Sequence, residues 1–225
     1  MMKTIVISLG GSLVVPEKNI LATKYLLEFK KIILKFSQKI RFIVIVGGGK
    51  TCRFYQAVAR NVGVQKGDLD WIGIFSSRLN AVFVKSLFGE KAYPEILASP
   101  LEKIKTKKII FSAGWKPGRT TDYVSVRFCQ TYQAEEVLNL TNIDYVYTKD
   151  PKKFKDAEKI KETSWQNYSK IVGKKHQPGG NYPFDPIASI QAKKLKIKLI
   201  SINGRNLKAV ENYLTGKKFI GTIIK

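Results

Sequence analysis

The stretch FIVIVGGGK, residues 42–50, decides the fold of this chain of 225 residues. Its five apolar residues, four of them β-branched, are typical of a buried strand. The three glycines that follow let an anion approach the main chain with no Cβ in the way, and a helical pattern begins directly after them. The stretch therefore predicts one strand–turn–helix unit of an α/β sheet, with a candidate phosphate site in its turn.

Strand-like and helical patterns alternate on both sides of this unit. Such alternation predicts an α/β fold in which a largely parallel sheet is covered by helices on both faces, with ligands gathered at the carboxyl ends of the strands. A charged, loop-like stretch at residues 150–186 is a candidate lid. The expected strands are residues 4–9, 42–46, 108–111, 137–140, 198–202 and 219–224. The expected helices are residues 20–36, 51–61, 69–88, 121–133 and 186–195.

Composition predicts one compact, cytoplasmic unit, since 44% of the residues are hydrophobic and no linker divides the chain. No segment is apolar over the roughly 18 residues that a membrane span needs, and the start of the chain does not fit a signal peptide. Cys52, Cys129 and the single His176 lie far apart, which argues against a protein-held metal site. We interpret both cysteines as packing residues.

The net charge of +23 favours anionic partners such as phosphates, nucleotides or nucleic acid. Most of the lysines are spread over predicted helix faces, so a solvated surface explains the charge as well. Clusters of arginine and exposed aromatic residues suited to base stacking are not evident. We therefore expect nucleic acid to bind only through non-specific charge.

Two further glycine-rich turns follow predicted strands. Gly10-Gly11-Ser12 follows residues 4–9, and the sequence AGWKPGRTTD follows the third strand at residues 113–122. A structural turn explains any one of them, whereas their recurrence favours phosphate binding, with Lys50 or Arg53 to neutralise the charge. Thr120 and Thr121 suit either a helix N-cap or a substrate contact. A dinucleotide fingerprint is absent, and a P-loop would need glycine where the chain has Val44.

Six segments, in this order and spacing, resemble the uridylate kinases of the amino-acid kinase superfamily, and its archaeal-type branch most. The resemblance implies a three-layer α/β/α sandwich, with residues 1–225 as one domain. Residues of about 1–135 would bind the acceptor and about 136–225 would bind ATP. It also implies the reaction ATP + UMP to ADP + UDP, with Mg²⁺ carried by ATP, and a homo-oligomer, a hexamer formed through the helix at residues 69–88. The segments are LGGS (9–12), VGGGK (46–50) with Arg53, DLDWIGIFSSRLNA (68–81), WKPGRTTD (115–122), LTNIDYVYTKDP (140–151) and YPFDPIAS (182–189).

The resemblance also assigns roles to residues of this chain. The implied catalytic residues are Lys50, Arg53, Asp144 and Asp185. The implied ATP-binding residues are Gly10, Gly11, Gly49, Arg53, Thr141, Asn142, Tyr147 and Asp150. The implied UMP-binding residues are Gly48, Asp70, Gly114, Trp115, Lys116, Pro117, Gly118, Arg119, Thr120 and Thr121. Three of the acids also have structural interpretations: Asp70 as a helix N-terminal acid, Asp150 as part of a turn and Asp185 as an N-cap before Pro186.

The chain departs from the family pattern at three places. Ser8 stands where many members have a lysine two residues before the first Gly-Gly, so Lys3, Lys50 or Arg53 would have to supply that charge. Tyr145 and Ser112-Ala113 stand where relatives commonly have glycine, and tyrosine tolerates positive φ poorly. Two other functions therefore stay open. One is a kinase of the same fold for isopentenyl phosphate, carbamate or an amino acid, and the other is a catalytically silent homologue that binds nucleotide or nucleic acid.

Overall fold

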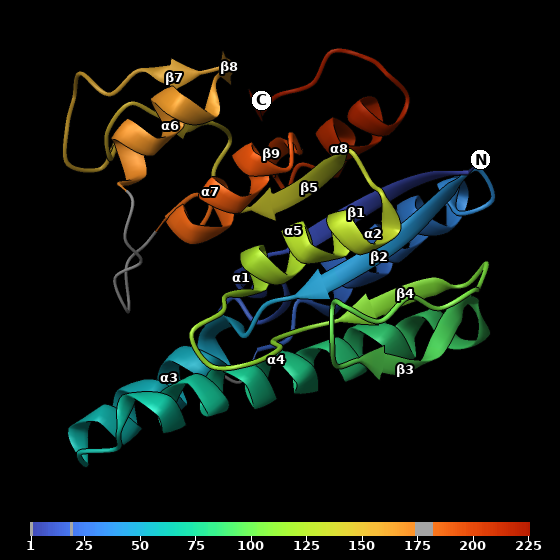
Figure 1. Ribbon diagram of the computed structural model, residues 1–225, viewed down its shortest axis with the longest axis horizontal. Helices are drawn as coiled ribbons and strands as arrows, with labels where there is room; N and C mark the ends of the chain where they lie inside the picture. Colours follow the sequence, from blue (N-terminus) through green and yellow to red (C-terminus); the bar gives the residue numbers. More distant parts are fainter. Residues whose placement is uncertain (1, 19, 174–181) are drawn as a thin grey trace.

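One eight-stranded sheet runs through the protein, in the order β3-β4-β2-β1-β5-β9-β10-β8 (Figure 1). The computed structural model describes residues 2–18, 20–173 and 182–225. Neighbouring strands pair in parallel except β10, which runs antiparallel to β9, and β6 and β7 form a separate two-stranded ribbon. The strands are β1 (Lys3–Leu9), β2 (Ile40–Val46), β3 (Ala92–Leu97), β4 (Ile109–Ser112), β5 (Glu136–Thr141), β6 (Val146–Tyr147), β7 (Lys159–Ile160), β8 (Glu162–Thr163), β9 (Lys198–Asn203) and β10 (Thr222–Ile224).

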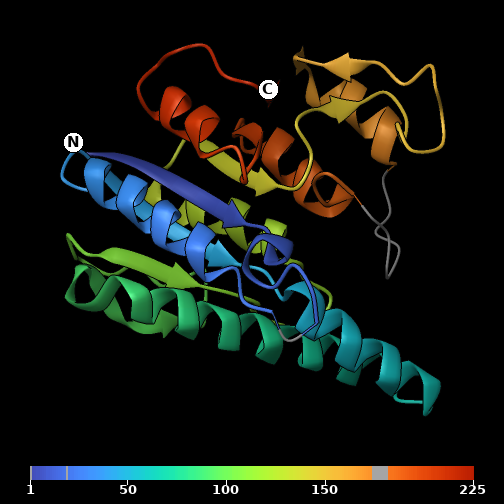
Figure 2. The same cartoon turned by 180° about the vertical axis from the view of Figure 1, so that it is seen from behind.

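Helices cover both faces of this sheet because its central strands are apolar on both sides (Figures 1 and 2). In β1, Ile5 and Ile7 pack with α1, α2, α4 and α8 in one core, whereas Val6 packs with α5, α6 and α7 in the other. The expected three-layer sandwich with a mainly parallel sheet is confirmed. The helices are α1 (Gly11–Val14), α2 (Thr23–Phe36), α3 (Gly49–Asn61), α4 (Lys66–Phe88), the 3₁₀ turn η1 (Gly89–Lys91), α5 (Thr121–Tyr132), α6 (Trp165–Val172), α7 (Pro186–Lys194) and α8 (Leu207–Leu214).

Several element boundaries differ from those expected. The helix expected from residue 20 begins at Thr23, and the strand expected at residues 219–224 covers only Thr222–Ile224. The sequence did not predict β3, which has an exposed Pro94 and Glu95 in its middle. Proline is tolerated there because β3 is an edge strand. The helix α8 was also not expected.

The stretch considered as a lid, residues 150–186, is partly ordered secondary structure. It contains β7, β8 and the helix α6, whose Trp165 and Tyr168 are buried against the sheet. Residues 174–181, including His176, lie outside the described residues. The helix α6 of this stretch therefore packs as part of the fold, whereas residues 150–156 are exposed turns.

The helices α3 and α4 form a hairpin that projects beyond the sheet (Figures 1 and 2). α4 has 23 residues and begins at Lys66, three residues before the expected start. The C-terminal half of α4 packs on the sheet through Ala81 and Val84. Its N-terminal half packs on α3, so one helix joins the hairpin to the core.

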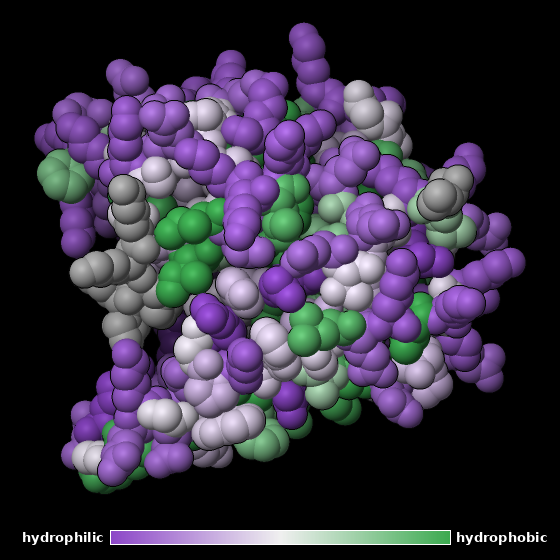
Figure 3. All heavy atoms as spheres, in the orientation of Figure 1, coloured by the Kyte–Doolittle hydropathy of each residue, from purple (hydrophilic) through white to green (hydrophobic). Residues whose placement is uncertain are grey.

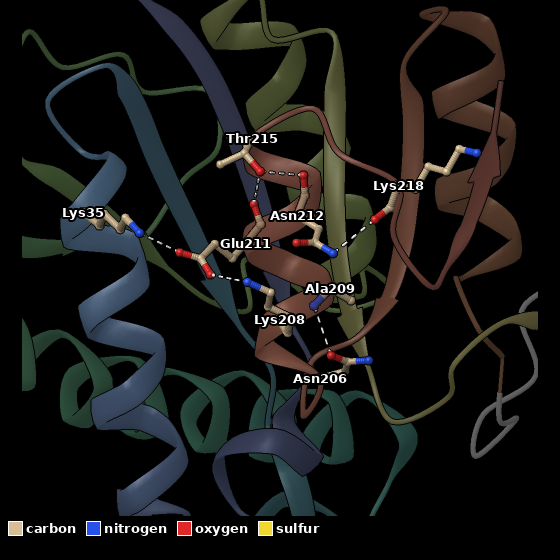
Figure 4. A network of polar contacts seen from close by, with 8 residues as sticks. All are labelled: Lys35, Asn206, Lys208, Ala209, Glu211, Asn212, Thr215 and Lys218. Carbon is tan, nitrogen blue, oxygen red and sulfur yellow. Dashed lines mark hydrogen bonds and ion pairs between the residues drawn. The ribbon is translucent and has the colours of Figure 1, made fainter.

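A polar network fixes α8 against α2 on the side of this core (Figure 4). Lys35 of α2 donates to Glu211 of α8 at 2.7 Å, and Lys208 lies 3.5 Å from the other carboxylate oxygen. The hydrogen bond from Lys35 lowers the pKa of Glu211. Asn206 caps α8 by accepting from the N–H of Ala209. The ion pairs of Lys35 and Lys208 with Glu211 are on the surface, so they orient α8 more than they stabilise it.

The surface agrees with the basic composition. Hydrophilic residues cover most of the face drawn in Figure 3, with smaller hydrophobic areas between them. Among the helices in the described ranges, none combines the length and the apolar character needed to cross a bilayer.

Candidate active site

The first two glycine turns touch each other, because β1 and β2 pair in parallel and end together at Leu9 and Val46. A Cβ placed on Gly11 would lie 2.1 Å from the Gly49 nitrogen. Gly49 has a φ of +63° and would meet the Gly11 oxygen at 2.5 Å. Only glycine fits either position. The protein's own backbone therefore requires these glycines, whether or not a phosphate binds beside them.

Both turns lead into helix starts that carry no side-chain cap in the described structure: Gly10 precedes α1 and Gly48 precedes α3. The first N–H groups of a helix have no partner inside the helix, and they suit an anion when no side chain caps them. Lys50 and Arg53 lie in the first two turns of α3 with exposed side chains. These two cations are thus free to approach a bound phosphate.

A cavity of about 440 Å³ opens between the second glycine turn, the α3–α4 hairpin, the loop at residues 113–120 and α7. It unites segments that are far apart in the sequence, as the parallel sheet order predicts. Trp115, Pro117, Lys50 and Arg53 do not line it. The expected site residues that line it are Gly48, Asp70, Gly114, Lys116, Gly118, Arg119, Thr120, Thr121 and Asp185.

Polar side chains of α4 hold the loop at residues 113–120 in place. Asp70, in the second turn of α4, accepts a hydrogen bond from the Gly118 N–H at 2.8 Å and so joins the loop to this helix. Ser77 accepts from the Gly114 N–H at 2.9 Å. Arg78 donates to the carbonyl oxygens of Gly114 and Trp115 at 3.2 and 3.4 Å. Hydrogen bonds from the protein's own side chains therefore define the conformation of the loop.

The same helix also reaches the second glycine turn. The side-chain amide of Asn80 donates to the carbonyl oxygens of Gly47 and Gly48 at 2.9 and 3.0 Å. One helix thus contacts both loops of the cavity.

The loop ends at the start of α5, where Thr120 is the N-cap. Its hydroxyl accepts from the Tyr123 N–H at 3.2 Å. The guanidinium of Arg119 lies 4.6 Å from the centre of the Tyr123 ring, and the ammonium of Lys116 lies 4.3 Å from that of Trp115. Aromatic neighbours therefore restrain two cations at the cavity.

Ser8 lies beneath this region, and its side chain is buried. Its hydroxyl donates to Asp122 at 3.1 Å, and the second carboxylate oxygen of Asp122 accepts from the Asp185 N–H at 3.0 Å. Asp185 itself caps α7 by accepting from Ala188 at 2.8 Å. The N-cap interpretation of Asp185 is confirmed, and the same residue faces the cavity.

Lys3 does not replace the lysine that Ser8 displaces. It forms an ion pair with Glu136 at 2.6 Å at the start of β1, about 20 Å from Gly10 at the usual rise of a strand. The basic residues nearest in sequence to the second turn are Lys50 and Arg53 of α3, and the loop at residues 113–120 contributes Lys116 and Arg119 to the cavity that Gly48 lines.

The expected ATP-binding residues do not line the cavity. They run from the last residue of β5 through β6 to the turn after it: Thr141, Asn142, Tyr147 and Asp150. Local turns hold them: Thr141 accepts from the Ile143 N–H at 3.1 Å, and Asp150 accepts from the Lys152 N–H at 3.0 Å. The turn interpretation of Asp150 is thereby confirmed, without deciding its role toward ATP.

Asp144 belongs to the same loop and is exposed. Its carboxylate accepts from the Asn203 side chain at 2.8 Å, which joins the ends of β5 and β9. Tyr145 has no positive φ, so the loop accommodates the tyrosine without backbone strain. Ser112 is accommodated as well, since its hydroxyl donates to the Leu97 carbonyl at 2.7 Å.

Sequence reasoning missed one face of α3. Cys52, Gln56 and Arg60 line the cavity at four-residue spacing from Gly48, and residues four apart share a helix face. That spacing was a usable signal. Burial raises the pKa of the Cys52 thiol, with Arg53 and Arg60 opposing the shift. The thiol is therefore a neutral wall of the cavity at neutral pH.

Sequence reasoning also missed Ser77, Arg78 and Asn80, although the quoted segment contains them. Their signal is a polar cluster on a helix that otherwise supplies core residues. Among the described residues, no three His, Cys, Asp or Glu side chains form a group that could hold a metal ion.

The sequence model of the amino acid kinase family matches residues 3–203. Together with the sheet order and the paired glycine turns, this match places the protein in a class: the chain belongs to the amino acid kinase family. The family expected from the sequence is therefore confirmed.

Within that family, the chain is similar to archaeal uridylate kinases. The uridylate kinase of Methanobrevibacter smithii is 33% identical over 224 residues, which cover 96% of this chain and 98% of the relative. That of Thermoplasma volcanium is 32% identical over 228 residues, which cover 100% and 99%. The crystal structure of uridylate kinase from Archaeoglobus fulgidus matches with a TM-score of 0.84 at 31% identity, covering 98% of this chain and 99% of that one.

Proposed function

We propose that this chain is a uridylate kinase, which transfers the γ-phosphoryl group of ATP to UMP in pyrimidine nucleotide synthesis. The observation that carries the proposal is the cavity between Gly48, α4 and the loop at residues 113–120. It lies beside the turn at Gly10 and Gly11, whose backbone touches Gly49. An acceptor phosphate in the cavity and a donor phosphate on the first turn would meet where the two turns join.

In this proposal the cavity holds UMP. Lys116 and Arg119 supply positive charge for its phosphate, and N–H groups at Gly48 and at the start of α5 add hydrogen bonds. Asp70 has one carboxylate oxygen bonded to Gly118, which leaves the other for the ribose hydroxyls. The volume of about 440 Å³ is in the range of small-molecule sites. The remaining residues assigned to UMP, Trp115 and Pro117, would act by shaping the loop.

ATP would lie across the carboxyl ends of β1 and β5. Its phosphates would contact Gly10, Gly11 and Gly49, and its adenosine would lie along the loop at residues 141–150. Magnesium would enter with the ATP phosphates, whose oxygens are the hard ligands that this ion prefers. Asp144 and Asp185 are the acids assigned to the reacting centre. The division into an acceptor part, about residues 1–135, and an ATP-binding part, about 136–225, stays a prediction, as does the cytoplasmic location.

Phosphoryl transfer needs alignment of the two phosphates and neutralisation of the negative charge on the phosphoryl group that is transferred. Ser8 supplies no charge, and its hydroxyl is engaged by Asp122. We therefore assign the neutralising role to Lys50 and Arg53, whose side chains are exposed beside the glycine turns. Both lie early in α3, where the helix dipole also favours negative charge.

We also propose that the enzyme assembles through α4. Its exposed side carries four large apolar residues at helical spacing, Trp71, Phe75, Leu79 and Val82, which are 42%, 61%, 64% and 49% exposed. A contiguous apolar stripe of this kind marks an association surface. The hexamer implied by the resemblance is the expected assembly. Light scattering after size exclusion should show a smaller species for Phe75→Arg than for the unsubstituted protein, and an equal mass would count against this surface.

An ADP-release assay with ATP and Mg²⁺ tests the activity. We expect turnover with UMP above that with CMP, AMP, GMP or isopentenyl phosphate. Asp70→Ala and Arg53→Ala should each lower kcat/KM by roughly a hundredfold. Turnover with another acceptor and none with UMP would show that the enzyme is a kinase for that other acceptor. ATP binding without turnover for any acceptor would instead favour a silent nucleotide-binding protein, a function that the Ser8 substitution motivates.

A further inference from the structure

We propose that Asn80 is a positioning residue of the kinase reaction: its side-chain amide orients the glycine turn that receives the phosphates. The inference rests on the proposed function and concerns a residue to which neither the fold nor the family expectation gives a role. Asn80 is 3% exposed and lies on the face of α4 that points to the glycine turn. Asn80 does not line the cavity, so any effect on substrate binding passes through the backbone groups that it contacts.

The hydrogen bonds of Asn80 match its donors one to one. A side-chain amide has two N–H donors on one nitrogen, and this nitrogen lies 2.9 Å from the Gly47 carbonyl oxygen and 3.0 Å from the Gly48 carbonyl oxygen. The Gly48 oxygen also accepts from the Cys52 N–H at 3.3 Å, the first bond of α3. Two successive peptide groups are therefore tied to α4 through their oxygens.

Peptide geometry converts this contact into control of the N–H groups. In a planar trans peptide the N–H points opposite to the C=O. When Asn80 holds the oxygens of Gly47 and Gly48, the N–H groups of Gly48 and Gly49 point away from α4. Those are the two N–H groups proposed to face UMP and ATP. Asn80 thus aims both donors without touching either substrate.

A glycine turn needs such a restraint more than other turns do. Glycine populates both halves of the backbone map with little steric cost, so a Gly-Gly peptide can rotate between opposite orientations. The Gly47 N–H is fixed by the Leu9 carbonyl at 3.0 Å, which holds the start of the turn only. Asn80 adds a restraint at the next two peptides, the second of which the Cys52 N–H also holds, and favours a single orientation of the donors.

The position of Asn80 also links the two loops of the cavity. Ser77 precedes it by three residues and therefore shares its helix face, and Ser77 accepts from the Gly114 N–H at 2.9 Å. One rigid turn of α4 thereby sets the separation between the glycine turn and the loop at residues 113–120. That separation determines how well the acceptor phosphate fits.

Two substitutions test the role of Asn80. Asn80→Ala removes both donors, and Asn80→Asp keeps the shape but places a carboxylate against two carbonyl oxygens. We expect the KM for UMP to rise about tenfold in Asn80→Ala, with a larger loss of kcat/KM in Asn80→Asp. The KM for ATP should rise less, because ATP has further contacts along the loop at residues 141–150. If the Asp variant does not fold, the Ala variant alone decides.

Val84→Ala is the matched control. Val84 lies one turn further along α4, is buried, and packs in the core, and its side chain has no hydrogen-bonding group to offer either loop. It should lower the melting temperature and leave both KM values within about twofold of the original, since it changes packing alone. The same pattern in Asn80→Ala, a lower melting temperature with an unchanged KM for UMP, would overturn the positioning role.

Hydrogen–deuterium exchange separates this inference from the proposed function. Amides in residues 47–52 should exchange faster in Asn80→Ala than in Val84→Ala, by about tenfold, when the turn loses its restraint. This holds even if the protein shows no turnover with UMP, in which case the kinase assignment fails and the role of Asn80 in the turn stands. Equal exchange in the two variants would refute it.

Discussion

Side chains of one helix, α4, hold the loops on the proposed acceptor side of the site, whereas local turns and contacts from several elements hold the loop on the proposed ATP side. Asp70, Ser77 and Asn80 bind backbone groups between 32 and 48 residues away in sequence. On the other side, Thr141 and Asp150 bind N–H groups two residues ahead. The conformation of the acceptor loops therefore depends on one distant helix, whereas that of the ATP loop depends on local turns together with Asn203 and Thr222, which bond to Asp144 and to the Val146 N–H.

A substitution where the two glycine turns touch should lower activity more than any other. In Gly11→Ala the new Cβ would lie 2.1 Å from the Gly49 nitrogen, so the two turns must separate. We expect kcat/KM to fall at least about a hundredfold, because an ångström of misplacement is enough for such a loss. The control is Gly67→Ala, where a Cβ meets nothing within 4 Å, and activity should be retained. Steady-state kinetics decide, and an active Gly11→Ala variant would mean that the turns need not touch.

Asp185 allows its structural and chemical roles to be separated. Asn is as good an N-cap as Asp, so Asp185→Asn should keep the stability, whereas Asp185→Ala should lose about 1 kcal/mol. If the charge serves the reacting phosphates, kcat should fall about tenfold in both variants. Thermal melts and initial rates give the comparison. A fully active Asp185→Asn variant would show that the reaction does not need the negative charge of Asp185, and that its N-cap bond to Ala188 is the role that matters.

A matched pair tests whether the two sides are independent. Arg78→Met removes two hydrogen bonds from the acceptor loop and should raise the KM for UMP about tenfold, a loss of roughly 1.4 kcal/mol. Asn203→Ala removes two exposed bonds, one to Asp144 and one from the Arg205 N–H. Water can substitute for both, so the KM for ATP should rise only about threefold. Each variant should leave the KM for the other substrate unchanged. Equal effects on both substrates would show that the sides are coupled.

The smallest effect is expected far from the site, at Lys35. Lys35→Met removes the ion pair that lowers the pKa of Glu211, and the exposed pair contributes little. A lowered carboxyl pKa stabilises the fold above the pKa of the unfolded chain, and this contribution is lost as the pH falls through the folded value. The small difference in melting temperature between the two proteins should be present at pH 7 and shrink as the pH falls below the ordinary titration range of a glutamate carboxyl. A difference that persists in acid would require another cause.

The sequence predicted the central part of the fold better than its edges. The central strands are rich in apolar residues, and such runs are recognised as strands from the sequence. These strands are β1, β2, β4, β5 and β9. β3 was not recognised, because an edge strand with proline and exposed residues lacks any two-residue alternation. The helix α6 is short and follows a lysine-rich segment, so its three buried residues gave too weak a period.

The sequence predicted those parts of the candidate site that contain glycine-rich turns. Glycine-rich turns after strands identified the loops, and parallel pairing placed them at one edge of the sheet. The residues that hold those loops were not identified, since Arg78 and Asn80 differ from surface polar residues only in what they contact. Only the packing of α4 shows that their partners are carbonyl oxygens of two separate loops.

The attachment of the acceptor loop to α4 has a consequence for protein engineering. A chimera that takes residues 113–121 from another kinase would receive a new loop but keep this protein's own Ser77 and Arg78. The new loop would then lack the α4 side chains that hold it in the donor protein. Altered acceptor preference would then require the loop and the middle of α4 to be exchanged as one cassette. Directed evolution toward a new acceptor should accordingly accumulate paired changes in these two segments.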